Sequence, residues 1–539
     1  MIFADNVPYH YLLWLLFVLL IFLELVSFFY PVAGGLGMYL WMLVSILILL
    51  ISIYSFYYFY KNVQDKHKIF LYLSWFIMLV FTIYNATKSS NISYETTQEA
   101  ACLLGFINES GDKGFQQSCF LGYPARQYLM LALPTIFLKP SLTSLNIGGS
   151  LYFLAAQLFW GVGLYKFFKQ KSNYSSFFSA LSLVFLLHFF YFNHFLFHCF
   201  EQSQFPLSLS MAFWGIYLWK ISDSQNWHLP LLGLLLLFII QSYTPSLAFF
   251  FLAILLLLDL YRYGEPKKRI FIVVIGGLAS FFFSLTFRSD IKLIGENHGS
   301  FSFLLNEGWL LIKHLFWRGQ GFSNYSSIIG KIVLVLAFLS PLFKNSKKII
   351  LLALWVIVTM FVATISQGYS FYGLDMRAHR SIIILPTAIF LALNTLQLIF
   401  KKNQINTRFF SLIFIIITTL GIWYAQSYLS SKPIHHYLHL FNYFRDNIRN
   451  VDEVEFLVFT EKSNKNFISL DDSLKYFYPH LKKVQTSYDD LGRYSKNSRC
   501  VLIFEESEKP HIPNYFINSG EIILNSNSRY IIFTHNIGT

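Results

Sequence analysis

Charged side chains are scarce in this chain of 539 residues. Asp, Glu, Lys and Arg make up 13% of the sequence, whereas hydrophobic residues make up 55%. Soluble domains carry about 25% charged residues, so this composition argues against an ordinary soluble protein. The apolar residues instead form long runs. A run of about twenty crosses a bilayer as a helix, because every backbone polar group must be paired within the segment there.

Cysteine is also scarce. The chain has four cysteines, too few for a disulfide scaffold. Cys102 and Cys119 share one polar segment and can form a single disulfide if that segment lies outside the cytoplasm; two unpaired thiols are the alternative. Cys199 and Cys500 are expected to be ordinary buried thiols.

About thirteen apolar runs have the length and composition of membrane-spanning helices. The runs lie at residues 10–30, 37–60, 69–86, 145–165, 176–196, 203–220, 228–242, 244–261, 270–287, 327–343, 349–366, 381–400 and 409–428. A cleavable signal peptide is not expected, because Pro31 to Gly35 lead at once into the second run.

Positive charge is concentrated in the short connections that join alternate runs. The net charge is +13. The residues concerned are Lys61, Lys66, Lys68, Lys166, Lys169, Lys171, Lys220, Arg262, Lys267, Lys268, Arg269, Lys344, Lys347, Lys348, Lys401, Lys402 and Arg408. The positive-inside rule makes this side cytoplasmic, so the N-terminus is predicted inside and the C-terminus outside. The same distribution favours contact with membrane lipid head groups and argues against a nucleic-acid partner.

Three larger connections fall on the opposite, extracytoplasmic side. They span residues 87–146, 288–326 and 367–380. The first two contain semi-apolar stretches, Arg126 to Leu138 and Phe301 to Trp317, which are too short to span and suit helices lying in the interface. Together these loops are expected to build a catalytic chamber at the outer membrane surface.

The composition changes after about residue 430, where strand-like and helix-like segments alternate. The strands are expected at Val454–Thr460, Cys500–Phe504, Glu521–Leu524 and Tyr530–Thr534, and the helices at Ile434–Ile448 and Ser473–Leu481. Without a Gly-rich phosphate loop, this segment is interpreted as a cover or recognition module. The sequence therefore predicts an α-helical polytopic membrane protein with about 13 transmembrane helices over 1–430 and a small C-terminal extracytoplasmic α/β domain over 431–539.

Glu95 and Glu99 are the candidate catalytic residues of the first outer loop. Their spacing of four residues would put both carboxylates on one face of a helix. One could then act as a general base for a hydroxyl or amine acceptor while the other orients the substrate or a metal. A solvated loop surface is the alternative, and it is the favoured interpretation for Glu109 and Asp112.

His194, His198 and Glu201 lie at the predicted outer turn between the fifth and sixth spans. Offsets of four and three residues place them on one helical face. Imidazole and carboxylate suit several divalent metal ions, so the three residues are a weak candidate metal site. Hydrogen bonding at a helix end is the alternative.

Two cationic groups lie in extracytoplasmic connections, although most positive charge lies in the connections predicted to be cytoplasmic. Arg377, His379 and Arg380 come immediately before a span, and Arg presents a fork of donors that matches phosphate oxygens. Lys313 and Arg318, with His314 between them, follow the same reasoning in the second loop. Both groups are candidates for binding a phosphate-bearing lipid; contact with bulk lipid head groups is the alternative.

Three further stretches have a pattern in common with a known family. The first runs from Gly122 to Pro134 and continues at Phe137 to Leu142. The second runs from Leu234 to Asp259 with an interruption at Tyr243 to Ser246, and the third from Arg377 to Pro386. Together they resemble the GT-C superfamily of membrane glycosyltransferases, of the protein mannosyltransferase and aminoarabinose transferase type. The resemblance loosely covers most of the chain.

The resemblance implies an inverting transfer of a sugar from a polyprenyl-phosphate donor to a lipid, glycan or protein acceptor on the extracytoplasmic face. Glu95 or Glu99 would act as the base or orient the acceptor. Arg377 and Arg380 would stabilise charge on the departing phosphate, an electrostatic role that matters most where water is scarce.

The resemblance also implies that Tyr123 lines the donor pocket and that Glu201 lies near the active-site turn. The expected location is the bacterial inner (plasma) membrane, with a role in cell-envelope glycan biosynthesis. Two alternatives stay open: a lipid-linked oligosaccharide polymerase or ligase, and a membrane transporter or flippase without transferase chemistry. The absence of a repeat, and the few charges inside spans apart from Glu24 and Asp259, disfavour a transporter.

Overall fold

The protein is described as a computed structural model. The described residues are 9–27, 32–63, 67–88, 142–171, 174–192, 204–223, 225–242, 247–287, 316, 328–344, 346–365, 379–403, 407–431, 454–460, 480–487, 489–490, 500–505, 517–525 and 528–535. Statements about structure below refer to these residues.

Thirteen α-helices form the first part of the described chain, and each coincides with one predicted span. They are α1 (Tyr9–Ser27), α2 (Val32–Asn62), α3 (Lys68–Lys88), α6 (Leu142–Lys169), α7 (Ser175–Phe192), α8 (Gln204–Ser222), α9 (His228–Ser242), α10 (Leu247–Asp259), α11 (Lys267–Phe287), α14 (Ile328–Phe343), α15 (Lys347–Ile365), α17 (Leu385–Asn403) and α18 (Thr407–Ser431). Two 3₁₀ helices, η5 (Leu260–Tyr263) and η6 (His379–Ile384), lead out of α10 and into α17. Pro386 stands in the first turn of α17, where a missing N–H is tolerated.

Within the described residues, three helical segments are long and apolar enough to cross a membrane: Tyr39–Lys61, Ile147–Lys169 and Ile382–Lys401. Six shorter apolar helices accompany them, including His10–Val26 and His228–Gln241. Many large apolar side chains point outward from the bundle, such as Phe22 and Phe76. This surface suits lipid rather than water, and the chain is an integral membrane protein. The expectation that all thirteen helices cross the lipid stays a prediction.

The helices pack closely at glycine positions. A Cβ added at Gly163 of α6 would lie 2.1 Å from the backbone oxygen of Gly215 in α8, and one added at Gly215 would meet the backbone of Phe159. Small residues let helix backbones approach closely in membrane proteins, where packing replaces the hydrophobic effect between helices. The indole N–H of Trp75 in α3 donates to the backbone oxygen of Gln157 in α6 at 3.3 Å. These contacts hold α3 against α6, and α6 against α8.

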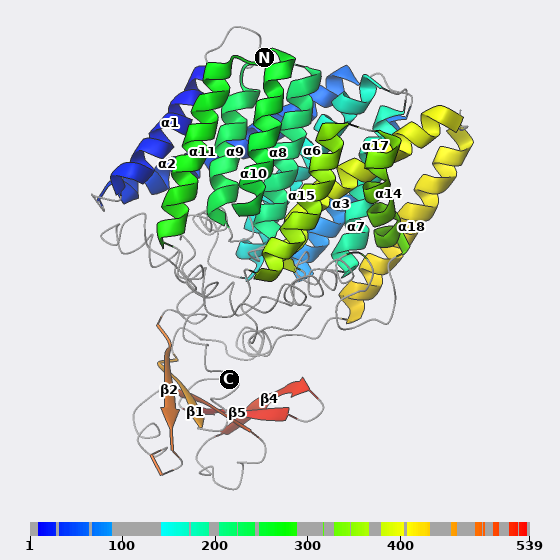
Figure 1. Ribbon diagram of the computed structural model, residues 1–539. Helices are drawn as coiled ribbons and strands as arrows, with labels where there is room; N and C mark the ends of the chain where they lie inside the picture. The colour runs from blue at the N-terminus through cyan, green and yellow to red at the C-terminus, as the bar shows by residue number, and fades with distance from the viewer. Residues whose placement is uncertain are drawn as a thin grey trace.

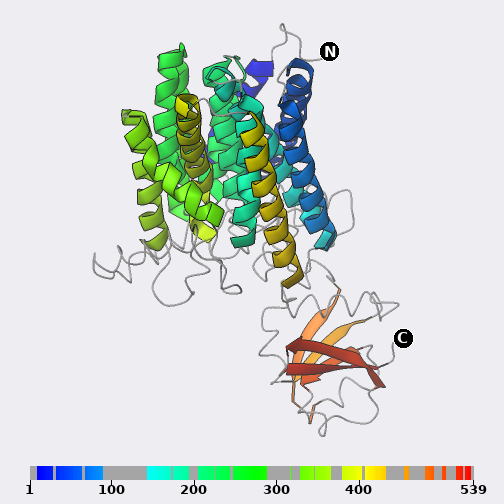
Figure 2. The ribbon, with the colours of Figure 1, turned by 90° about the vertical axis from the view of Figure 1, so that its right-hand side faces the viewer.

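Several short connections meet at one end of the bundle. Lys166, near the end of α6, lies 2.8 Å from Asp223, which follows α8. Gln397 of α17 donates to the backbone oxygen of Lys171 at 3.5 Å. We call this the lysine-rich end; it comprises the connections that follow α2, α6, α8, α10, α14 and α17. The opposite end is called the sheet end, because a β-sheet lies beyond it (Figures 1 and 2).

The sheet has five strands in the order β2-β1-β3-β5-β4. They are β1 (Phe456–Thr460), β2 (Lys482–Thr486), β3 (Cys500–Glu505), β4 (Ile517–Asn525) and β5 (Ser528–His535). β1 pairs in parallel with β2 and β3, whereas β5 is antiparallel to β3 and β4. The interior of β3 is fully buried, and burial raises the pKa of the Cys500 thiol to about 11.

Four of the five strands were expected from the sequence, and β2 was not. Its residues, Lys482 to Thr486, are mostly polar and partly exposed, and β2 is an edge strand that pairs only with β1 among the described strands. An edge strand buries little, so it lacks the apolar pattern that identifies a strand. The predicted helix 434–448, and all but the last two residues of the predicted helix 473–481, lie outside the described residues.

Candidate active site

Nearly all the candidate site residues lie outside the described part of the chain. This holds for Glu95, Glu99, Cys102, Cys119, Tyr123, His194, His198, Glu201, Lys313, Arg318 and Arg377. His379 and Arg380 begin η6, where the backbone is described. The structure nevertheless describes the helices that precede and follow each of these loops.

The helix η6 anchors the loop that carries the arginines. Ile382, Ile383 and Ile384 are almost completely buried, and η6 packs against α8, α15 and α17. Just below it, the indole N–H of Trp214 in α8 donates to the hydroxyl of Thr387 in α17 at 3.1 Å. The backbone at Arg380 is therefore held beside α8, the helix that begins three residues after Glu201.

The first outer loop leaves from the same group of helices. It begins after α3 and ends where α6 begins. α3 packs against α6 and α7, and α6 packs along α8. α7 ends at Phe192, shortly before His194 and His198 in the sequence. The first outer loop thus ends at α6 and the loop with the late arginine ends at η6, and both α6 and η6 pack against α8.

The second outer loop is described at one residue. Phe316 is helical, only 1% exposed, and belongs to the core cluster of the bundle. It lies in the semi-apolar stretch 301–317, between Lys313 and Arg318. This loop ends at α14, which packs against α17. The apolar part of the loop therefore contacts the bundle at this point.

A buried polar cluster lies toward the sheet end of three other helices. Gln241 of α9 donates to the carboxylate of Glu24 in α1 and lies 2.6 Å from the hydroxyl of Ser280 in α11. All three side chains are about 1% exposed. The sequence identified Glu24 as a charge inside a span, but it contained no signal for its partners, which come from distant helices. A buried carboxyl with hydrogen-bond partners is a stable way to hold α1 against α9 and α11.

The lysine-rich end carries several ion pairs between connections. The backbone of Gly264 has φ +87°, a left-handed conformation that glycine adopts without strain, and its N–H caps η5. The turn brings the carboxylate of Glu265 onto Lys220 of α8, and these side chains are 7% and 1% exposed. Burial disfavours the charged form of Asp223, but the hydrogen bond and charge of Lys166 outweigh it, so the pKa of Asp223 lies below its usual value.

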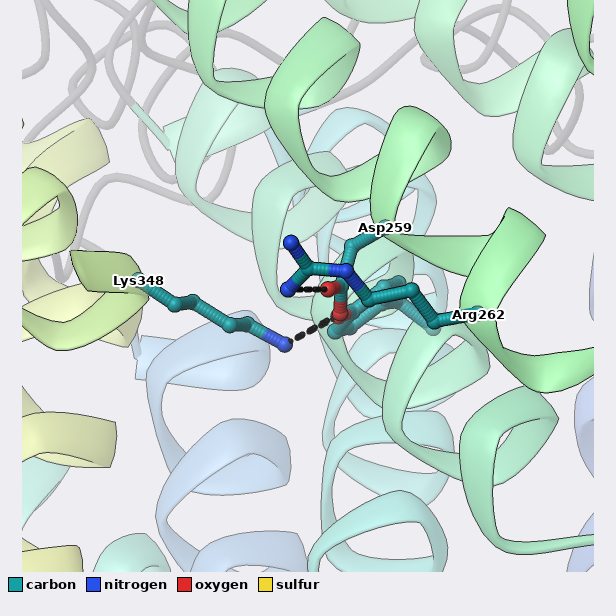
Figure 3. A network of polar contacts seen from close by, with 4 residues as sticks. Asp259, Arg262 and Lys348 are labelled. Atoms are coloured by element: carbon teal, nitrogen blue, oxygen red, sulfur yellow. Dashed lines mark hydrogen bonds and ion pairs between the residues drawn. The ribbon is translucent and has the colours of Figure 1, made fainter. Parts of the chain in front are cut away.

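Asp259, the second charge noted inside a span, is also paired at this end. Its carboxylate lies 2.7 Å from the ammonium of Lys348 in α15 and 3.3 Å from Arg262, as Figure 3 shows, and it accepts a hydrogen bond from Tyr217 at 2.7 Å. These contacts join α8, α10 and α15. Both charges that could have indicated a mid-membrane transport site thus have structural partners.

Metal binding finds no support in the described helices and strands. Among those residues there is no group of three or more His, Cys, Asp or Glu side chains that could hold an ion. The candidate trio His194, His198 and Glu201 lies outside them, so that metal site stays a prediction.

The architecture defines a class: a polytopic helical membrane bundle followed by a small β-sheet. No protein-family model matches the chain, and no curated protein sequence matches it. Solved structures do match it. Among them are two of ArnT from Cupriavidus metallidurans, one in the apo state and one bound to undecaprenyl phosphate.

The likeness to ArnT covers most of both chains at low sequence identity. For the undecaprenyl phosphate complex the TM-score is 0.51 at 10% identity, covering 86% of this chain and 97% of that one. For the apo structure it is 0.47 at 10% identity, covering 81% and 93%. The chain therefore shares the fold of ArnT, and the resemblance to the GT-C superfamily, aminoarabinose transferase type, is confirmed as a likeness of fold.

Proposed function

We propose that this protein is an integral membrane glycosyltransferase that moves a sugar from a polyprenyl-phosphate donor to an acceptor on the extracytoplasmic face. The observation that carries the proposal is the fold shared with ArnT bound to undecaprenyl phosphate, which extends over 86% of this chain. A common fold can host several activities. The proposal therefore rests also on the chemistry of the residues expected at the sheet end.

In the proposed reaction, Glu95 or Glu99 removes a proton from the acceptor hydroxyl or amine. The acceptor atom attacks the anomeric carbon, and the bond from that carbon to the phosphate oxygen breaks. Arg377 and Arg380 stabilise the negative charge left on the phosphate. The packing of α3 with α6 and α7, and of η6 with α8, supports a common location for these groups.

The first test measures donor turnover by the purified full-length protein in liposomes with a polyprenyl-phosphate sugar. Arg377→Ala is expected to lower turnover by about 10²-fold or more, because the variant lacks a hydrogen-bond donor aimed at the negative charge that develops on the phosphate. Arg262→Ala is the control, since that arginine is 77% exposed at the lysine-rich end. Equal turnover by the Arg377→Ala variant and the wild type would exclude the phosphate role.

The second test separates a transferase from a transporter. A transporter that alternates access must separate helices at both ends of the bundle, whereas a transferase can work with the lysine-rich end closed. Lys166→Cys with Asp223→Cys, joined by a short bifunctional thiol reagent with the native cysteines replaced, should keep transfer activity. The Lys166→Cys single variant treated with the same reagent is the control. Absence of transfer by the unlinked protein, together with transport across the membrane that the link abolishes, would favour the transporter.

A further inference from the structure

Two lysines at the lysine-rich end belong to a cluster with too few carboxylates. Lys171 follows α6, and Lys344 follows α14. Both Lys344 and Lys348 are close enough to Lys171 to act on it electrostatically. Lys348 points to Asp259, which it shares with Arg262 (Figure 3). Among the described residues, the carboxylate of Asp259 is therefore paired with two of these four cationic side chains.

Lys171 is held in a defined position. Its ammonium lies 3.4 Å from the centroid of the Phe167 ring, and its backbone oxygen accepts the hydrogen bond from Gln397. No carboxylate is paired with the ammonium of Lys171 or Lys344 in the described structure, and the sequence has no Asp or Glu at 170–174 or 344–347. Burial and the two neighbouring lysines lower the pKa of Lys171 to about 7.

Such an arrangement is unfavourable unless an anion completes it. Like charges in a partly buried site repel strongly, because water screens them less there. A phosphate group offers several oxygens to lysine ammonium groups from different segments. The site is open on the side of Lys344, which is exposed.

We propose that Lys171 and Lys344, with Lys348 beside them, bind the phosphate of an anionic membrane lipid. The surface next to the site favours a lipid over a soluble phosphate. Leu342 and Phe343, immediately before Lys344, are 78% and 49% exposed. An acyl chain can lie against these side chains while the head group reaches the lysines.

The test uses the full-length protein in nanodiscs and counts bound lipid by native mass spectrometry. With phosphatidylglycerol, Lys171→Gln with Lys344→Gln should lower lipid retention by about tenfold or more, since the phosphate loses two charge-assisted hydrogen bonds at one site. Lys268→Gln with Arg269→Gln is the matched control. It removes the same charge from exposed positions in the first turn of α11 and should leave retention unchanged.

The remaining arms identify the source of the phosphate. Phosphatidylcholine should not be retained by the wild type or by either double variant, because its head group has no net charge. If the wild type retains no phosphatidylglycerol but binds inorganic phosphate, the soluble ion is the source of the phosphate and the lipid proposal is overturned. Equal loss of phosphatidylglycerol from both double variants would overturn the proposal, since it would show general surface attraction rather than a site.

Discussion

Replacing Glu95 or Glu99 with glutamine is expected to lower sugar transfer by about 10²- to 10⁴-fold, the contribution of a general base. Glutamine keeps the size and hydrogen-bonding capacity of the side chain but cannot take a proton. The loss should fall on turnover, with expression and membrane insertion unchanged. The measurement is glycan modification in cells and transfer by the purified protein with a polyprenyl-phosphate sugar.

Matched controls for this experiment are in the same loop. Glu109→Gln and Asp112→Asn remove carboxylates that are expected to face solvent, so both variants should keep wild-type transfer. The comparison separates a base from a general effect of charge on the loop. Full activity in both single glutamine variants and in their combination would mean that neither Glu95 nor Glu99 is the base.

Breaking the buried ion pair between Lys220 and Glu265 is expected to have the largest effect on stability. Replacing one partner leaves the other charge buried, which costs about 3–5 kcal/mol. Lys220→Met and Glu265→Gln should each lower the apparent melting temperature in detergent. The side chains are 1% and 7% exposed, so water cannot easily replace the lost partner.

The double variant Lys220→Met with Glu265→Leu tests the reason for this loss. Apolar side chains of similar size leave no unpaired charge, and such replacements are often neutral. We therefore expect the double variant to be much closer to the wild type than either single variant. If the single variants are as stable as the wild type, the pair does not hold α8 to the start of α11.

These two experiments concern opposite ends of the bundle. The ion pairs join the connections at the lysine-rich end, from Lys166 and Asp223 to Asp259 and Lys348. The outer loops begin and end at the sheet end. A bundle held together at one end can present a fixed set of helix ends at the other, which favours chemistry that needs pre-positioned groups. The proposed transferase would use the structure in this way.

The helical architecture could be predicted because the length and composition of each apolar run predict a helix without knowledge of its neighbours. Every predicted span coincides with a helix, and the largest differences concern boundaries, such as the extension of α2 from Val32 to Asn62. Strands with a buried apolar pattern, such as Cys500–Glu505, were found for the same reason. The strand Lys482–Thr486 was not, because pairing with β1, rather than its own composition, makes it a strand.

The candidate site was predicted from residue types and from a resemblance, and its residues stay predictions. What the structure adds is the grouping of the helices that flank them: α3 and α6 for Glu95 and Glu99, and η6, packed against α8, for the late arginine. This grouping depends on contacts between segments far apart in the sequence. Local patterns contain no information about such contacts.

The sequence by itself determined that this protein is a bundle of apolar helices with a strand-forming segment after it, because hydrophobic length and period act within one segment. Only the tertiary structure decided which polar groups meet. Glu24 could have faced a transport path, and Asp259 could have faced lipid. Their partners, Gln241 and Lys348, lie 217 and 89 residues away, and packing alone brings them together.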